Sequence, residues 1–137
     1  MPPSLRALTV AAWLIPVGIL AQAVLAGQGL YLDPSLFGLH GGIGHGVLLL
    51  ALLAASFIWA ARFPRHVGVL ASLTVVGLLG QVGLGYAGRR SALEAASAVH
   101  VPLGVTLLGL SVVVAVLVTQ HSALVGRTSD LSQAENG

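Results

Sequence analysis

The stretch that decides the fold is VGILAQAVLA at residues 17–26, because it returns as VGLLGQVGLG at residues 76–85, 59 positions later. A second segment, HGGIG at residues 40–44, returns as HVPLG at residues 100–104, at an offset of 60. Each half of the chain therefore carries Gly-x-x-x-Gln-x-x-x-(Ala/Gly) followed by His-x-x-x-Gly. Self-similarity at a fixed offset indicates a repeated structural unit.

The composition around these segments is that of a membrane protein. Apolar residues make up 56% of the 137 residues and charged residues 7%, whereas a soluble domain carries about 25% charged residues. This balance excludes a soluble globule, a disordered segment and a nucleic-acid binder. The chain has no Cys, which excludes disulfides, thiolate metal sites and covalent c-type haem attachment.

Four apolar runs are each long enough to cross a bilayer core of about 30 Å, and without water their backbones must be helical. The predicted fold class is all-α, an integral membrane four-helix bundle made of two repeated helical hairpins. Two helices per repeat give both hairpins one orientation, related by a pseudo-two-fold axis along the membrane normal, the parallel-repeat case. We expect a single domain over residues 1–121 and a polar, disordered cytoplasmic tail over 122–137. The expected helices are about 7–30, 37–61, 67–86 and 95–120, and the expected repeats about 7–61 and 67–120.

The arginines predict the orientation. Four lie on the side of the termini and the 62–66 turn, and two lie on the other side. Because cytoplasmic connections carry the excess of positive charge, we expect both termini in the cytoplasm and a multi-pass protein of the inner (plasma) membrane. A cleaved signal peptide ending near Ala21-Gln22-Ala23 is the alternative for the first run, but the repeat requires this run to be retained.

The repeated polar residues are the candidate site. Residues four apart share a helix face, so Gln22 and Gln81 lie on stripes of small residues and should face the bundle interior. His40 stands one turn from Gly44, as His100 does from Gly104, and a histidine above a bare backbone patch suits a flat ligand. Two such histidines at one depth could be the axial ligands of one haem iron. Arg89 and Arg90, in the connection nearby, would pair with haem propionates.

A Gln-bearing helix followed by a His-opened helix, twice over, resembles one four-helix half of the haem A synthase family. The pattern also resembles small four-helix membrane proteins of unassigned function that share the "AQ…LAG" and "H…G" segments. The resemblance covers about residues 13–118 and implies haem held between His40 and His100. The first apolar run lacks the glutamate that the synthase carries there and only one symmetric His pair is present, so haem binding and electron transfer carry over and oxidation of a haem methyl group does not.

The sequence thus predicts a small b-type cytochrome-like membrane protein. Haem b is the candidate cofactor, with His40 and His100 as the metal ligands near the outer face. The expected partners are the lipid bilayer and a quinone or redox partner protein, with no nucleic acid and no independent catalysis. The alternative is a non-catalytic membrane subunit or scaffold without a cofactor, in which the Gly/Gln stripes are packing surfaces. A transport unit is disfavoured because no charged residue lies well inside an apolar run.

Three further histidines have no repeat partner. His45 points about 140° away from His40 on the helix, and Val105 occupies its equivalent position. We expect His45 to pack or hydrogen-bond, and it remains the spare ligand. His66 and His121 are expected at the inner interface, where a second ligand pair is the weaker alternative.

Overall fold

The structure is a computed structural model that describes the backbone of residues 2–91 and 94–135, and the side chains of these residues except 89–91, 94, 97 and 129–135. The described chain is all-helical. Each helix contains a segment that is long and apolar enough to cross a membrane, so the chain has the architecture of a multi-pass membrane protein. The helices are α1 (Pro3–Tyr31), α2 (Leu36–Ala60), α3 (Arg65–Ser91) and α4 (Glu94–Glu135).

The helices are longer at several ends than hydropathy predicts. The largest difference is in α4, which continues to Glu135, where the sequence predicted a disordered tail from residue 122. The segment after His121 contains no proline and many good helix formers, so the helical ladder continues past the apolar run. Pro16 and Pro102 lie inside α1 and α4 without ending them, as transmembrane helices allow.

The four helices form a closed ring of neighbours. Helix α1 packs against α2 and α4, and α3 packs against the same two helices. Among the described residues, the diagonal pairs α1/α3 and α2/α4 have no close backbone approach. Consecutive helices are therefore antiparallel neighbours, as the short connections predict.

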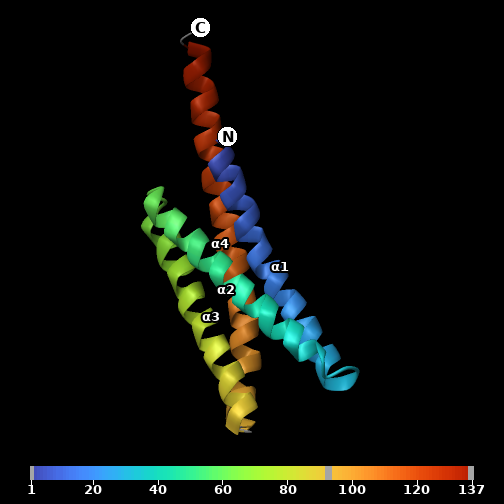
Figure 1. The fold of residues 1–137 in the computed structure, drawn as a ribbon. Coiled ribbons are helices and arrows are strands. Elements are labelled where there is room, and N and C mark those ends of the chain that lie inside the picture. The colour runs from blue at the N-terminus through green and yellow to red at the C-terminus, as the bar shows by residue number, and fades with distance from the viewer. Residues whose placement is uncertain (1, 92–93, 136–137) are drawn as a thin grey trace.

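The two ends of the bundle differ. The start of α1, the end of α4 and the α2–α3 turn lie at one end, and the α1–α2 connection, the end of α3 and the start of α4 lie at the other, where the two hairpins diverge (Figure 1). We call these the closed end and the open end. At the closed end, the ring centroids of Phe63 and His121 lie 4.3 Å apart. This contact joins the α2–α3 turn to α4.

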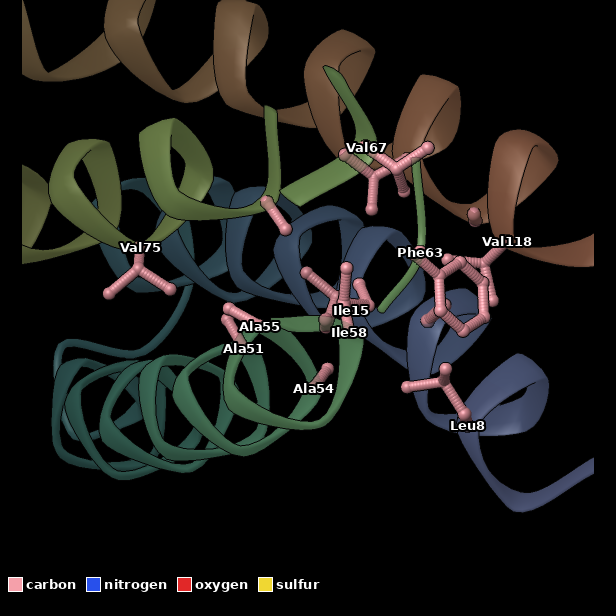
Figure 2. Close-up of a cluster of buried hydrophobic side chains, with 14 of the residues drawn as sticks. Leu8, Ile15, Ala51, Ala54, Ala55, Ile58, Phe63, Val67, Val75 and Val118 are labelled. Carbon is pink, nitrogen blue, oxygen red and sulfur yellow. The ribbon is translucent and has the colours of Figure 1, made fainter. Parts of the chain in front are cut away.

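The hydrophobic core lies between the helices, extending from the closed end (Figure 2). Alanines such as Ala12, Ala51 and Ala55 are buried in it, and small residues allow close helix approach in lipid. Buried positions recur at the two offsets of the repeat. Examples are Leu8 with Val67, Ala12 with Ala71, Ala55 with Ala115, and Ile58 with Val118.

Two indole hydrogen bonds connect the hairpins nearer the closed end. Trp13 Nε1 of α1 donates to Thr119 Oγ1 of α4 over 3.1 Å, and Trp59 Nε1 of α2 donates to Ser72 Oγ of α3 over 3.1 Å. Ser72 lies 59 positions after Trp13, and Thr119 lies 60 positions after Trp59. The two contacts are therefore equivalent under the offsets of the repeat, with donor and acceptor exchanged.

The two described connections use local hydrogen bonds. After α2, the N–H of Phe63 donates to Ile58 O and that of Arg62 to Trp59 O, the pattern of a Schellman motif. Before α2, the N–H of Ser35 donates to the carboxylate of Asp33 over 2.9 Å. This backbone hydrogen bond holds the pKa of the exposed Asp33 carboxyl below its ordinary value.

Candidate functional site

His40 and His100 face each other between the diagonal helices α2 and α4. Their ring centroids are 6.3 Å apart and the ring planes are tilted by 50°, and both side chains are partly buried. A metal–imidazole bond is about 2.0–2.1 Å long, so two imidazoles on opposite sides of one metal ion hold their centroids on the order of 6 Å apart. The structure thus brings together the two histidines that the repeat singled out, at a spacing that fits a shared ligand.

The orientation of the His40 ring is fixed by α1. His40 Nδ1 lies 3.0 Å from the backbone carbonyl oxygen of Gln22. A carbonyl oxygen only accepts, so Nδ1 carries the proton and donates it. The lone pair is then on Nε2, which is the arrangement that a metal-ligating histidine uses when a backbone carbonyl holds its other nitrogen.

The surroundings of His100 differ from those of His40. Here the glutamine side chain makes the contact, because Gln81 Nε2 donates to the backbone oxygen of His100 over 2.8 Å. Within the described part of the chain, His100 Nδ1 and Gln81 Oε1 are the buried side-chain atoms that have no hydrogen-bond partner. Buried polar atoms are rarely left unpaired in proteins, so this side of the site has unused hydrogen-bonding capacity.

The glycines below the histidines hold the glutamines. A Cβ built at Gly44 would lie 2.7 Å from Gln22 Nε2, and one built at Gly104 would lie 2.8 Å from Gln81 Nε2. The sequence predicted that these two glycines leave room for the edge of a macrocycle. In the structure the amide groups fill that space, because the glutamine stripe faces the second helix of its own hairpin.

The glycines one turn before each glutamine also lie close to the second helix of their hairpin. A Cβ at Gly18 would clash with Val47, and one at Gly77 would clash with Leu107. One turn beyond Gln81, a Cβ at Gly85 would lie 3.7 Å from His100 Cε1, so the His100 ring leans over bare backbone of α3. The stripes are therefore the packing surfaces within each hairpin.

The other predicted positions have different outcomes. The side chains of Arg89 and Arg90 lie outside the described residues, so their pairing with propionates stays a prediction. His121 packs against Phe63, and His66 is exposed at the start of α3. No group of three or more His, Cys, Asp or Glu residues that could hold a metal ion occurs among the described residues.

Sequence reasoning missed the partner of His45. The Nδ1 of His45 donates to Gly41 O of its own helix over 2.7 Å, and its Nε2 lies 3.3 Å from the hydroxyl of Tyr86 in α3. The available signal was that both residues are polar aromatics at positions where the other repeat has Val105 and Gly27. The expectation that His45 takes part in a hydrogen bond agrees with this contact.

Comparison with known proteins finds a match to a family of unknown function over part of the chain. The family model described as "Family of unknown function (DUF6220)" matches residues 22–88, from the middle of α1 to near the end of α3. The match includes Gln22, His40 and Gln81 but not His100. No curated protein and no solved structure matches the chain.

Proposed function

We propose that this chain is a small membrane haem protein of the b-type cytochrome kind, which holds haem b between His40 and His100 and transfers electrons. The single observation that carries the proposal is the 6.3 Å separation of the two rings. It is supported by the bond that leaves His40 Nε2 free for a ligand. The resemblance to one half of haem A synthase points to the same two residues.

The residues around the two histidines would orient these ligands and would take no part in a reaction themselves. The Gln22 carbonyl keeps the proton of His40 on Nδ1 and so keeps Nε2 available. Haem, when bound, supplies one-electron exchange between ferric and ferrous iron. With both histidines as ligands there is no open position for a substrate, so electron transfer without independent catalysis is the function that these residues support.

A duplicated hairpin explains why two histidines meet here. Three kinds of contact follow the offsets of 59 and 60. They are the glycine contacts to the second helix, the placement of each glutamine amide beside a glycine, and the indole hydrogen bonds with donor and acceptor exchanged. A parallel pseudo-two-fold axis that relates α1 and α2 to α3 and α4 would generate each pair. Residues at one depth on α2 and α4 then face each other across that axis.

The arginines also bear on how the protein lies in the membrane. We place the open end, with Arg89 and Arg90, on the outer side of the inner membrane, and both termini in the cytoplasm, because four arginines lie at the closed end and two at the open end. Arg89 and Arg90, at the same end of the bundle as His100, would then pair with the haem propionates. A quinone or a redox partner protein would exchange the electrons.

A second candidate is a scaffold or subunit without a cofactor. The specific observation in its favour is that Gln22 and Gln81 occupy the space beside Gly44 and Gly104. Such close packing with an interhelical hydrogen bond is also what holds helices together in lipid.

The test is the visible spectrum of detergent-purified protein from haem-replete cells. We expect one haem per chain, with a Soret band that sharpens on reduction by dithionite. His40→Ala and His100→Ala should each remove this spectrum, because one imidazole alone leaves the iron without its second ligand.

The control is His66→Ala, because His66 is exposed at the opposite end of the bundle. This variant should retain the full spectrum. A colourless wild-type protein would favour the scaffold, and a spectrum that survives in His40→Ala would refute the ligand assignment.

A further inference from the structure

A second polar site lies on α2 and α3, on a different face of α2 from His40. The rings of His45 and Tyr86 have centroids 6.0 Å apart in an edge-on arrangement, and the Tyr86 hydroxyl is 3.3 Å from His45 Nε2. Both residues lie in membrane-spanning segments. Both are exposed, Tyr86 to 48%.

The carbonyl of Gly41 decides the hydrogen-bond roles of a neutral His45. Its Nδ1 then donates to the Gly41 carbonyl, so Nε2 is the acceptor. The Tyr86 hydroxyl donates to it at a distance longer than the usual hydrogen bond with a hydroxyl donor, about 2.5–3.0 Å. This weak contact leaves the histidine lone pair and the tyrosine oxygen able to take a better partner.

The surface next to the pair is bare backbone. Gly42 and Gly83 lie three residues before His45 and Tyr86, and a Cβ built at either glycine meets nothing within 4 Å. Helices α2 and α3 diverge from the α2–α3 turn toward the open end (Figure 1), and the two rings, one from each helix, have centroids 6.0 Å apart. A flat ring can approach such a surface without displacing a side chain.

The pair is not repeated in the other half of the chain. Its equivalents by the offsets of the repeat are Val105 and Gly27, neither of which has a polar side chain. Polar side chains that face lipid are costly and in membrane segments mark functional sites. The polarity of the pair therefore favours a role in binding a ligand that arrives from the bilayer.

We propose that His45 and Tyr86 bind the head group of a hydroquinone. A hydroquinone is lipid-soluble and flat, and its ring carries hydroxyl groups that can donate to His45 Nε2 and accept from the Tyr86 hydroxyl. No other described pair offers one acceptor and one donor on an exposed membrane face beside open glycine backbone. The inference rests on the proposed function where it assigns a binding place to the quinone partner, but the binding itself needs no haem, so its test can fail while haem binding succeeds.

The test is titration calorimetry of the detergent-solubilised full chain with tetramethylhydroquinone. We expect saturable binding at one site per chain. Tyr86→Phe keeps the ring but removes the hydroxyl, and the loss of one hydrogen bond should raise the Kd about tenfold. His45→Phe removes the acceptor and should have an effect of the same size.

The matched control is Tyr31→Phe, because Tyr31 is the other tyrosine and is 85% exposed at the end of α1. It should leave the Kd unchanged and corrects for partition of the ligand into micelles. The dimethyl ether of the hydroquinone, which cannot donate, should bind wild-type protein at least tenfold more weakly. This ligand comparison holds even if a variant fails to fold. Equal binding of the hydroquinone and its ether, or equal Kd values for wild type and a folded Tyr86→Phe, would overturn the proposal.

Discussion

The two proposed ligands are equivalent in sequence but are held by different atoms. His40 uses its own Nδ1 on the backbone of Gln22, whereas His100 receives the side chain of Gln81 on its backbone oxygen. The first contact orients an imidazole, and the second orients a helix. We therefore expect His40 to be the ligand that is positioned before haem binds, and His100, whose Nδ1 is unpaired, to be the one that adjusts.

This difference gives a prediction for two glycines in equivalent positions. Gly104→Ala would push the amide of Gln81 away and break its bond to His100, so this variant should be less stable than Gly44→Ala by about 0.5–1.5 kcal/mol of unfolding free energy. The Cβ in Gly44→Ala meets the amide end of the Gln22 side chain, whereas the hydrogen bond of Gln22 to His40 uses the backbone oxygen and not this amide. Gly44→Ala should therefore be near neutral, since better helix propensity offsets the shift of the amide.

The measurement is unfolding of each purified variant in detergent micelles, followed by circular dichroism. Gly109→Ala is the control, because a Cβ there meets nothing within 4 Å, and it should be neutral or slightly stabilising. Equal destabilisation by Gly44→Ala and Gly104→Ala would show that the two glutamines are held alike.

The spacing of His, Gln and Gly in the sequence was enough to predict which residues gather, because i, i+4 positions share a face in any helix. It was not enough to predict which neighbour each face has. Gly44 and Gly104 were expected to adjoin a ligand but adjoin glutamines, since the choice depends on how closely two helices approach. The bond from Tyr86 to His45 depends on the position of α3 relative to α2, which no local pattern specifies.

At the scale of elements, the turn from α2 to α3 contains a strained residue. Arg62 has φ 56°, the left-handed conformation that costs a residue with a side chain about 1–2 kcal/mol. It occupies the position of the Schellman motif where glycine is preferred. The buried ring of Phe63 follows it and contacts His121, so the tertiary contact holds Arg62 in place.

Arg62→Gly should therefore stabilise the protein. We expect a gain of about 0.5–1 kcal/mol, because relief of the left-handed strain exceeds the extra chain entropy of glycine. The measurement is the thermal midpoint in detergent, with Arg65→Gly as the matched control that removes an equal charge from the first turn of α3. A gain of equal size in both variants would attribute the effect to charge rather than to φ.

Hydropathy predicted the number and order of these elements well, because apolar length decides membrane crossing. It predicted their ends less well. The extension of α4 to Glu135 is polar, and hydropathy does not distinguish a polar helix from a polar coil. The turn at residues 62–66 was predicted, but the left-handed conformation of Arg62 was not, because the sequence has arginine where the motif prefers glycine.

At the scale of the whole molecule, the two ends have different roles. The closed end holds the indole hydrogen bonds, the Phe63–His121 contact and the buried polar residue Ser122. The diverging hairpins hold His40, His100, His45 and Tyr86 toward the open end. Stability and proposed chemistry are thus separated along the membrane normal, so variants at the closed end should change unfolding without changing the proposed sites.

The orientation of this axis can be tested directly because the chain has no native cysteine. Ser35→Cys introduces an exposed thiol at the open end, and Thr128→Cys introduces an exposed one beyond the closed end. The arginine distribution places the open end outside. A membrane-impermeant maleimide added to intact cells should therefore label Ser35→Cys, and should label Thr128→Cys only after the cells are permeabilised. Labelling of Thr128→Cys alone would reverse the orientation and put the proposed haem near the cytoplasmic face. Labelling of both would contradict four crossings, because each site is separated from the other by α2, α3 and α4.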